Sequence, residues 1–196
     1  MLRQILGAYL SLAPAHLRFD LSARGKPELA PGSNPLHLRF NLSHTHGLAL
    51  VAVTRRREVG VDVEWSRPVA EATQIAERFF SPQESARLRA LPAEQRPAAF
   101  FNCWTRREAY LKATGEGIAE SPDRIEVTCA PREPARLLGV RGDPQAAVRW
   151  QLQELSPGPS YVAALAVKGR GLKVLLWDWS GAPAPAEGES WGVGDR

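Results

Sequence analysis

The chain has 196 residues, of which 44% are hydrophobic, and carries a formal net charge of +4. This length allows one globular domain or two small halves that share an interface, and the two widely spaced cysteines, Cys103 and Cys129, exclude a disulfide framework or a C-x-x-C zinc module. No apolar run approaches the roughly 20 residues of a membrane helix and no signal-peptide pattern opens the chain, so we expect a cytoplasmic protein.

Hydrophobic periodicity predicts one helix and four strands in the first part of the chain. Apolar residues recur at helical spacing over 2–13, and Pro14 ends the pattern. Between the strands we expect a loop rich in Gly and Pro over 25–35, an interruption at 43–47 and an exposed basic turn at 55–57. The predicted strands are 17–21, 36–42, 48–54 and 59–65.

Helices dominate the next stretch of the chain. A helix is predicted over 70–79, and Ser81 followed three residues later by Glu84 is typical of a capping box that starts another helix. The longest helix is expected over 97–114, where Gly115 ends it. Residues after 180 are rich in Gly, Ala, Pro and Glu and are expected to be disordered. The remaining strands are 125–129 and a hairpin of 148–155 with 161–167.

The order of helix, short strand, loop and hairpin occurs twice, over 2–54 and over 97–167. We therefore predict an α+β fold of two pseudo-symmetric halves, each a small antiparallel sheet packed with a long helix, with the active site in the cleft between them. The expected boundaries are 1–58 for the first half, 59–180 for the second half and 181–196 for the tail.

The segment Gly60-Val61-Asp62-Val63-Glu64-Trp65 places two carboxylates on one face of a strand. Side chains alternate between the two faces, so Asp62 and Glu64 point the same way while the valines point the other way. Stacked carboxylates repel each other unless a cation lies between them, and Mg²⁺ binds through carboxylates, waters and substrate phosphates. The alternative is an exposed face of an edge strand without a ligand.

The long predicted helix carries polar residues on its apolar side. At about 100° per residue, Arg107 falls within the stripe of Phe100 and Trp104, and Glu108 and Lys112 lie at its edge. Polar groups in such positions are costly unless they are paired or bound to a ligand. Glu108 and Lys112 are also four residues apart, so an ordinary helix ion pair is the alternative.

A third motif, Phe40-Asn41-Leu42-Ser43-His44, lies at the end of a predicted strand. Its hydroxyl and imidazole could contact a phosphate. The two histidines His44 and His46 could instead suggest a metal, but two histidines without further Cys or His nearby form a poor zinc site. A loop histidine without any ligand is the third interpretation.

Together and in this order, these motifs resemble the 4'-phosphopantetheinyl transferase superfamily, most closely its surfactin-synthetase-activating type, a monomer of two pseudo-symmetric halves. The resemblance covers about residues 2–167, and the ordered set is more specific than any single motif. It implies transfer of 4'-phosphopantetheine from coenzyme A to a serine of an apo acyl or peptidyl carrier protein, with Mg²⁺ as cofactor and adenosine 3',5'-bisphosphate as the second product. The matching segments are GKP at 25–27, FNLSH at 40–44, GVDVEW at 60–65, FFSPQE at 79–84 and WTRREAYLK at 104–112.

The resemblance also implies roles in catalysis and metal binding. Asp62, Glu64 and Glu108 would hold Mg²⁺, and Glu108, directly or through a water, would help to deprotonate the attacking serine. Lys112 would contact the phosphate and balance charge on the leaving group. Glu84 matches an acidic position of the family whose role, base or structural brace, stays open.

A second group of residues is implied to bind coenzyme A. Ser43 and His44 would lie on its 3'-phosphate side, and Lys26 with Pro27 would lie near the adenine. Arg107 stands where the family usually has lysine, which keeps the charge but changes the geometry of a phosphate contact.

The implied partners are coenzyme A and an acidic apo carrier protein, with no nucleic acid and no membrane. Family members also carry an opening segment, with a strand and basic residues that contact coenzyme A, ahead of the helix that matches 2–13. Its absence here raises the alternative of a catalytically impaired binder of coenzyme A or of a carrier protein.

The basic charge does not decide between these hypotheses. A pI of about 9.4 suits an anionic partner, but it is equally expected of a chain from an arginine-rich proteome. A nucleic-acid-binding domain is disfavoured, because Phe100, Phe101 and Trp104 cluster on a helix instead of alternating with arginines along strands.

Overall fold

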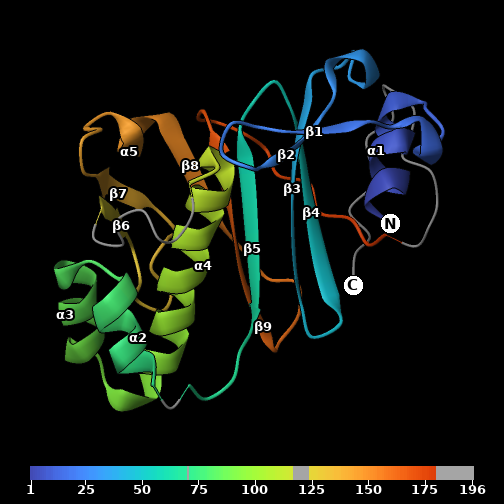
Figure 1. The fold of residues 1–196 in the computed structure, drawn as a ribbon. Helices are drawn as coiled ribbons and strands as arrows, with labels where there is room; N and C mark the ends of the chain where they lie inside the picture. Colours follow the sequence, from blue (N-terminus) through green and yellow to red (C-terminus); the bar gives the residue numbers. More distant parts are fainter. Residues whose placement is uncertain (70, 117–123, 180–196) are drawn as a thin grey trace.

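A long helix packed across a three-stranded antiparallel sheet forms the centre of the fold (Figure 1). The computed structural model describes residues 1–69, 71–116 and 124–179. The helix, α4, ends at Gly115, whose positive φ of 74° is a conformation that glycine adopts without a steric penalty. The helix is Arg96–Thr114, and the sheet has the order β5-β9-β8, with β5 at Val59–Trp65, β8 at Trp150–Leu155 and β9 at Tyr161–Lys168.

Small residues allow α4 to approach this sheet closely. Ala164 and Ala166 of β9 belong to the same apolar cluster as the buried residues of α4. A β-carbon added at Gly60 of β5 would lie 2.9 Å from the Cα atom of Ala113 and would overlap the backbone oxygen of Ala109. The opposite face of the sheet forms a second cluster of Val59, Val61, Val63, Leu155, Ala163, Leu165 and Val167.

Short elements cover the side of α4 that faces away from β5, as Figure 1 shows. The capping box predicted at Ser81 is present, since the Ser81 hydroxyl accepts a hydrogen bond from the backbone N–H of Glu84 and the Glu84 carboxylate accepts one from the N–H of Ser81. The short elements on this side of α4 are α2 at Ala72–Phe79, α3 at Pro82–Ala90, β6 at Ile125–Val127, β7 at Leu137–Val140 and α5 at Ala146–Arg149.

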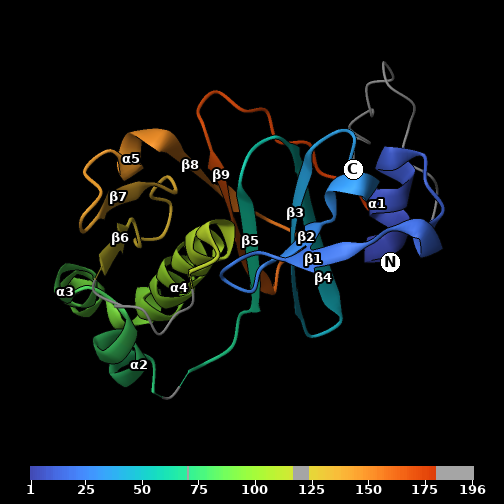
Figure 2. The same ribbon diagram turned by 45° about the horizontal axis from the view of Figure 1, so that its top comes forward.

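The N-terminal part of the chain forms a layer on the other side of β5, with β3 and β4 beside β5 and α1 beyond them (Figure 2). It has its own apolar cluster of Leu6, Leu10, Leu17, Leu29, Leu38 and Phe40. Its elements are α1 at Leu2–Leu10, β1 at Phe19–Leu21, β2 at Pro27–Leu29, β3 at Leu38–Thr45 and β4 at Leu48–Arg55, in which β1 pairs with β2 and β3 with β4. Three single-turn 3₁₀ helices complete the fold, at Pro14–His16, Pro31–Ser33 and Ala93–Gln95.

The predicted α+β class with small antiparallel sheets is confirmed. A helix, a short strand pair and a hairpin recur in that order, as α1, β1–β2 and β3–β4 and then as α4, β6–β7 and β8–β9. The two helices differ in length, with 9 residues in α1 and 19 in α4. The boundaries at 58 and 180 stay predictions, and the tail at 181–196 lies outside the described residues.

Two predictions about individual elements were wrong, and one strand was missed. The segment 25–35 contains β2, because Pro27 occupies the first position of the strand, where its missing N–H costs nothing. The strand was predicted to be interrupted from Ser43 onward, but β3 continues to Thr45, because these residues pair in register with β4. The strand β7 was not predicted, since its four residues acquire their partner only from β6.

Among the described residues, no helix combines the length and the apolar character that crossing a bilayer requires.

Because α4 lies so close to β5, adding a single methyl group at Gly60 should destabilise the fold. Replacing Gly60 by alanine should lower the free energy of unfolding by about 1–3 kcal/mol or more, because the added carbon overlaps the backbone of α4. Urea denaturation measures this change. The control is Gly139→Ala in β7, where an added β-carbon meets nothing within 4 Å. Equal urea midpoints for the two variants would contradict the proposed packing.

Candidate active site

At the edge of β5 that faces β3, backbone N–H groups donate hydrogen bonds to side chains instead of to a neighbouring backbone. The two strands belong to different hydrogen-bonded sheets. The backbone N–H of Val61 donates to Oδ1 of Asn41 at 2.9 Å, and that of Val63 donates to Oγ of Ser43 at 3.2 Å. From the first pair to the second, the residue number rises by two in both strands, so β3 and β5 run parallel. We call these four residues the side-chain seam; it joins the N-terminal layer to the central sheet.

Asp62 lies at the centre of a buried polar cluster next to this seam. Its side chain points toward α4, where Lys112 Nζ lies 2.6 Å from Oδ1. The Ser43 hydroxyl donates to the same oxygen at 3.1 Å, and Lys112 Nζ lies 3.0 Å from Ser43 Oγ. The second carboxylate oxygen, Asp62 Oδ2, is buried and has no hydrogen-bond partner among the described residues. An unpaired buried carboxylate oxygen is costly, which marks this position as one that a ligand can occupy.

Glu64 and Glu108 are the other two carboxylates of the predicted metal site, and the pKa of each is raised. Burial raises the pKa of Glu64, and the charge of Asp62 raises it further. Burial and Asp62 likewise raise the pKa of Glu108 from its ordinary value of 4.5 to about 7, against the opposing effect of Lys112. The charge of Asp62 raises the pKa of both other carboxylates, and these three groups, together with the unpaired Asp62 oxygen, fit a hard divalent cation such as Mg²⁺.

Glu84 acts as a structural brace. It is fully buried, and its oxygens accept hydrogen bonds from the backbone N–H groups of Ser81 and Val127 and from the Arg107 guanidinium, each at 2.8 Å. Burial raises its pKa, and Arg107 is the leading opposing influence. Of the two roles left open from the sequence, these contacts favour the brace. Arg107 is buried and also donates to the Ile125 oxygen, and its predicted phosphate contact stays a prediction.

The structure also brings together Glu84, Cys103 and Cys129, whose ligand atoms lie within 4.8 Å of one another. Asp62, Glu64 and Glu108 do not form such a compact group among the described residues. The oxygens of Glu84 are already used, and burial raises the pKa of the Cys103 thiol well above its ordinary value. A protonated thiol and a braced carboxylate do not suit a metal ion.

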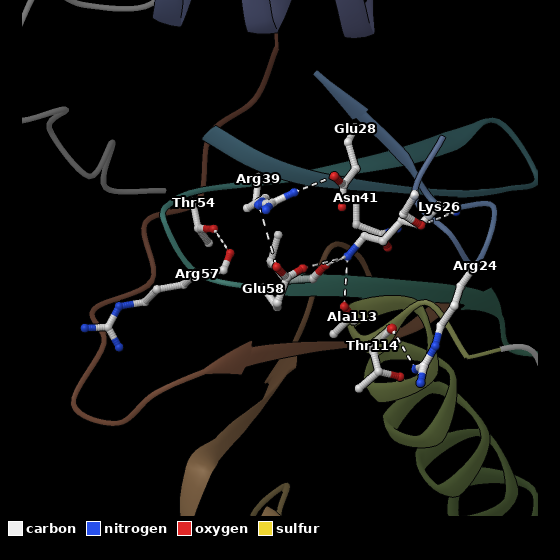
Figure 3. Close-up of polar contacts among 12 residues, drawn as sticks. Arg24, Lys26, Glu28, Arg39, Asn41, Thr54, Arg57, Glu58, Ala113 and Thr114 are labelled. Carbon is white, nitrogen blue, oxygen red and sulfur yellow. Dashed lines mark hydrogen bonds and ion pairs between the residues drawn. The ribbon is translucent and has the colours of Figure 1, made fainter. Parts of the chain in front are cut away.

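Lys26 is used to cap α4. Its side chain is 8% exposed, and Nζ donates to the backbone oxygens of Val59 at 2.8 Å and Ala113 at 2.9 Å (Figure 3). Arg24 on the same hairpin donates to the Thr114 oxygen at 3.3 Å. Cations at the C-terminus of a helix bind its last carbonyl groups and complement its dipole. Pro27 is exposed beside this cap, and its predicted position near an adenine stays a prediction, as does that of Lys26.

The predicted pair Ser43 and His44 is divided between two faces of β3. Ser43 is buried in the polar cluster, whereas His44 is exposed. The neighbouring His46 stacks on the Trp65 ring with centroids 4.3 Å apart. Sequence reasoning assigned no role to Asn41, although its position two residues before Ser43 places both side chains on one face of the strand.

Comparisons with known proteins match this chain to one family. A family model described as the 4'-phosphopantetheinyl transferase superfamily matches residues 58–166. The 4'-phosphopantetheinyl transferase HetI of Nostoc sp. is 45% identical over 179 residues, which are 91% of this chain and 72% of that protein. The 4'-phosphopantetheinyl transferase psf-1 of Bacillus pumilus is 36% identical over 119 residues, which are 61% of this chain and 48% of that protein.

A solved structure, described as a Chronobacterium ammoniagenes ACPS-CoA complex, is 22% identical, with a TM-score of 0.40 over 60% of this chain and 100% of that one. A likeness that weak does not establish a shared function.

The pKa of Glu108 predicts a pH dependence of stability. The folded protein holds the proton up to a pH of about 7, whereas the unfolded chain releases it near 4.5. The stabilising contribution is therefore complete below the unfolded value and is lost as the pH rises through the folded value. In metal-free buffer, Glu108→Gln should raise the urea midpoint at about pH 8 and change it less at about pH 5.

The control for this measurement is Glu94→Gln, which removes an exposed carboxylate. A difference between Glu108→Gln and the wild type that is the same at both pH values would contradict the raised pKa of Glu108.

Proposed function

Because this chain belongs to the 4'-phosphopantetheinyl transferase superfamily, we propose that it transfers 4'-phosphopantetheine from coenzyme A to a serine of an apo carrier protein. The serine oxygen forms a bond to the β-phosphorus of coenzyme A, the bond from that phosphorus to the bridging oxygen breaks, and adenosine 3',5'-bisphosphate leaves. The observation that carries the proposal is the unpaired, buried Oδ2 of Asp62 beside Glu64 and Glu108.

Asp62, Glu64 and Glu108 would hold Mg²⁺ in this proposal. When bound, the ion would neutralise the pyrophosphate of coenzyme A and polarise its phosphoryl oxygens. The oxygen-only donor set supports Mg²⁺ over softer metals, which prefer thiolate and imidazole ligands.

Glu108 is the group best suited to accept the serine proton. Without a metal, burial and the charge of Asp62 raise its pKa to about 7, and a bound cation would lower this pKa, so that the carboxylate would be ionised and able to accept a proton directly or through a water. Lys112 is 31% exposed at its side chain, so its ammonium can contact both Asp62 and a phosphate that enters the site. Phosphoryl transfer asks little covalent chemistry of the protein, so positioning and charge neutralisation provide most of the rate enhancement.

The remaining partners are also part of the proposal. The net charge of +4 would favour an acidic carrier protein. The candidate residues come from both layers of a single chain, with Ser43 on β3, Asp62 on β5 and Lys112 on α4, which supports action as a monomer.

The test is to incubate the protein with coenzyme A, Mg²⁺ and an apo carrier protein and to follow the intact mass of the carrier. Asp62→Ala should slow the transfer by about a hundredfold or more, because metal stabilisation of a transition state is worth several kcal/mol. The fold should be retained, since removing one of three adjacent carboxylates relieves their mutual repulsion.

The matched control is Asp20→Ala, which removes an exposed carboxylate from β1. Full activity of Asp62→Ala would show that the metal assignment is wrong. Binding of coenzyme A without any mass increase of the carrier would overturn the proposed transfer.

A further inference from the structure

The Ser43 hydroxyl has no hydrogen-bonding capacity to spare. A serine hydroxyl offers one donor hydrogen and two acceptor lone pairs. Ser43 Oγ has three polar neighbours: Asp62 Oδ1 at 3.1 Å, the backbone nitrogen of Val63 at 3.2 Å and Lys112 Nζ at 3.0 Å. Three contacts use the complete capacity of this atom.

The direction of each of these hydrogen bonds follows from the chemistry of the partners. A backbone N–H and a lysine ammonium can only donate, so Val63 and Lys112 occupy the two lone pairs of Ser43 Oγ. The hydroxyl hydrogen must therefore point to Asp62 Oδ1. The backbone of Ser43 is itself held in register opposite Leu50 of β4, so this hydrogen has a fixed position.

Asp62 is oriented as a result. Its Oδ1 accepts hydrogen bonds from both Ser43 and Lys112, while Oδ2 is buried and without a partner among the described residues. Rotation of the carboxylate about its last single bond would exchange the two oxygens, and it would break both hydrogen bonds to Oδ1. The contacts therefore reserve Oδ2 for another ligand.

The two donors to Asp62 differ in how firmly they are held. Lys112 is a flexible side chain that is 31% exposed and can move toward an entering phosphate. Ser43 is 6% exposed, and its short side chain is fixed by the backbone of two strands. When Lys112 turns to a substrate, Ser43 is the contact that keeps Asp62 in place.

We propose that Ser43 is a positioning residue, which orients Asp62 so that Oδ2 faces the divalent cation, instead of contacting the 3'-phosphate of coenzyme A. This inference rests on the proposed function, because it assigns a task to the carboxylate that would hold Mg²⁺. It predicts that the loss of the hydroxyl weakens metal binding and leaves the binding of coenzyme A alone nearly unchanged.

The experiment compares wild type, Ser43→Ala and Asn41→Ala. Asn41 is the matched control, because it bonds to β5 in the same seam but has no hydrogen bond to Asp62. Mn²⁺ replaces Mg²⁺ as the probe, and electron paramagnetic resonance of free Mn²⁺ gives its affinity without any turnover. Calorimetry in buffer with excess chelator gives the affinity for coenzyme A in the absence of metal.

Ser43→Ala should weaken Mn²⁺ binding roughly tenfold to a hundredfold, the usual effect of removing a partner that orients a metal ligand, and Asn41→Ala by less than about threefold. Metal-free binding of coenzyme A should change less than about twofold in both variants. An equal loss of Mn²⁺ affinity in the two variants would overturn the proposal, because loosening the seam would then be the whole effect.

A selective loss of coenzyme A affinity in Ser43→Ala, with Mn²⁺ affinity unchanged, would also overturn it and would restore the phosphate contact. Neither result would affect the proposed transfer. If the wild type itself binds no Mn²⁺ with or without coenzyme A, the metal site of the proposed function fails as well.

Discussion

The side-chain seam between β3 and β5 is the constraint on which the rest of the structure depends. An amide N–H at the edge of a buried strand needs an acceptor, and leaving one unpaired costs about 1–3 kcal/mol. Val61 and Val63 obtain theirs from Asn41 and Ser43 rather than from a backbone ladder. Two short polar side chains of β3, Asn41 and Ser43, therefore fix where the N-terminal layer lies along β5.

The site follows from this arrangement because the same strand β5 faces α4 with its other residues. Gly60 allows the backbone of the helix to come close, and this proximity brings Lys112 to Asp62 at 2.6 Å. Lys26, which belongs to the N-terminal layer, holds the C-terminal end of α4 through the Ala113 oxygen. Asp62 is thus held from both layers before any ligand binds, which is the preorganised charge that the proposed catalysis requires.

Local signals allowed much of this to be predicted from the sequence. The strand at 59–65, the helix at 97–114 and the cap at Ser81 follow from side-chain periodicity and backbone chemistry, and the structure confirms them within a residue or two. The role of Glu84 could not be predicted, because its partners Arg107 and Val127 are distant in sequence. The seam was missed for the same reason, and the unassigned amide of Asn41 was its only local signal.

Amide hydrogen exchange at Val61 and Val63, followed by nuclear magnetic resonance, tests the seam most directly. If side chains of β3 satisfy this edge, both amides should exchange slowly in the wild type, at rates comparable with those of N–H groups bonded within the β5–β9 ladder. In Asn41→Ala, the amide of Val61 should lose its protection first, while that of Val63 keeps its bond to Ser43. Fast exchange of both amides in the wild type, as at an open strand edge, would contradict the account.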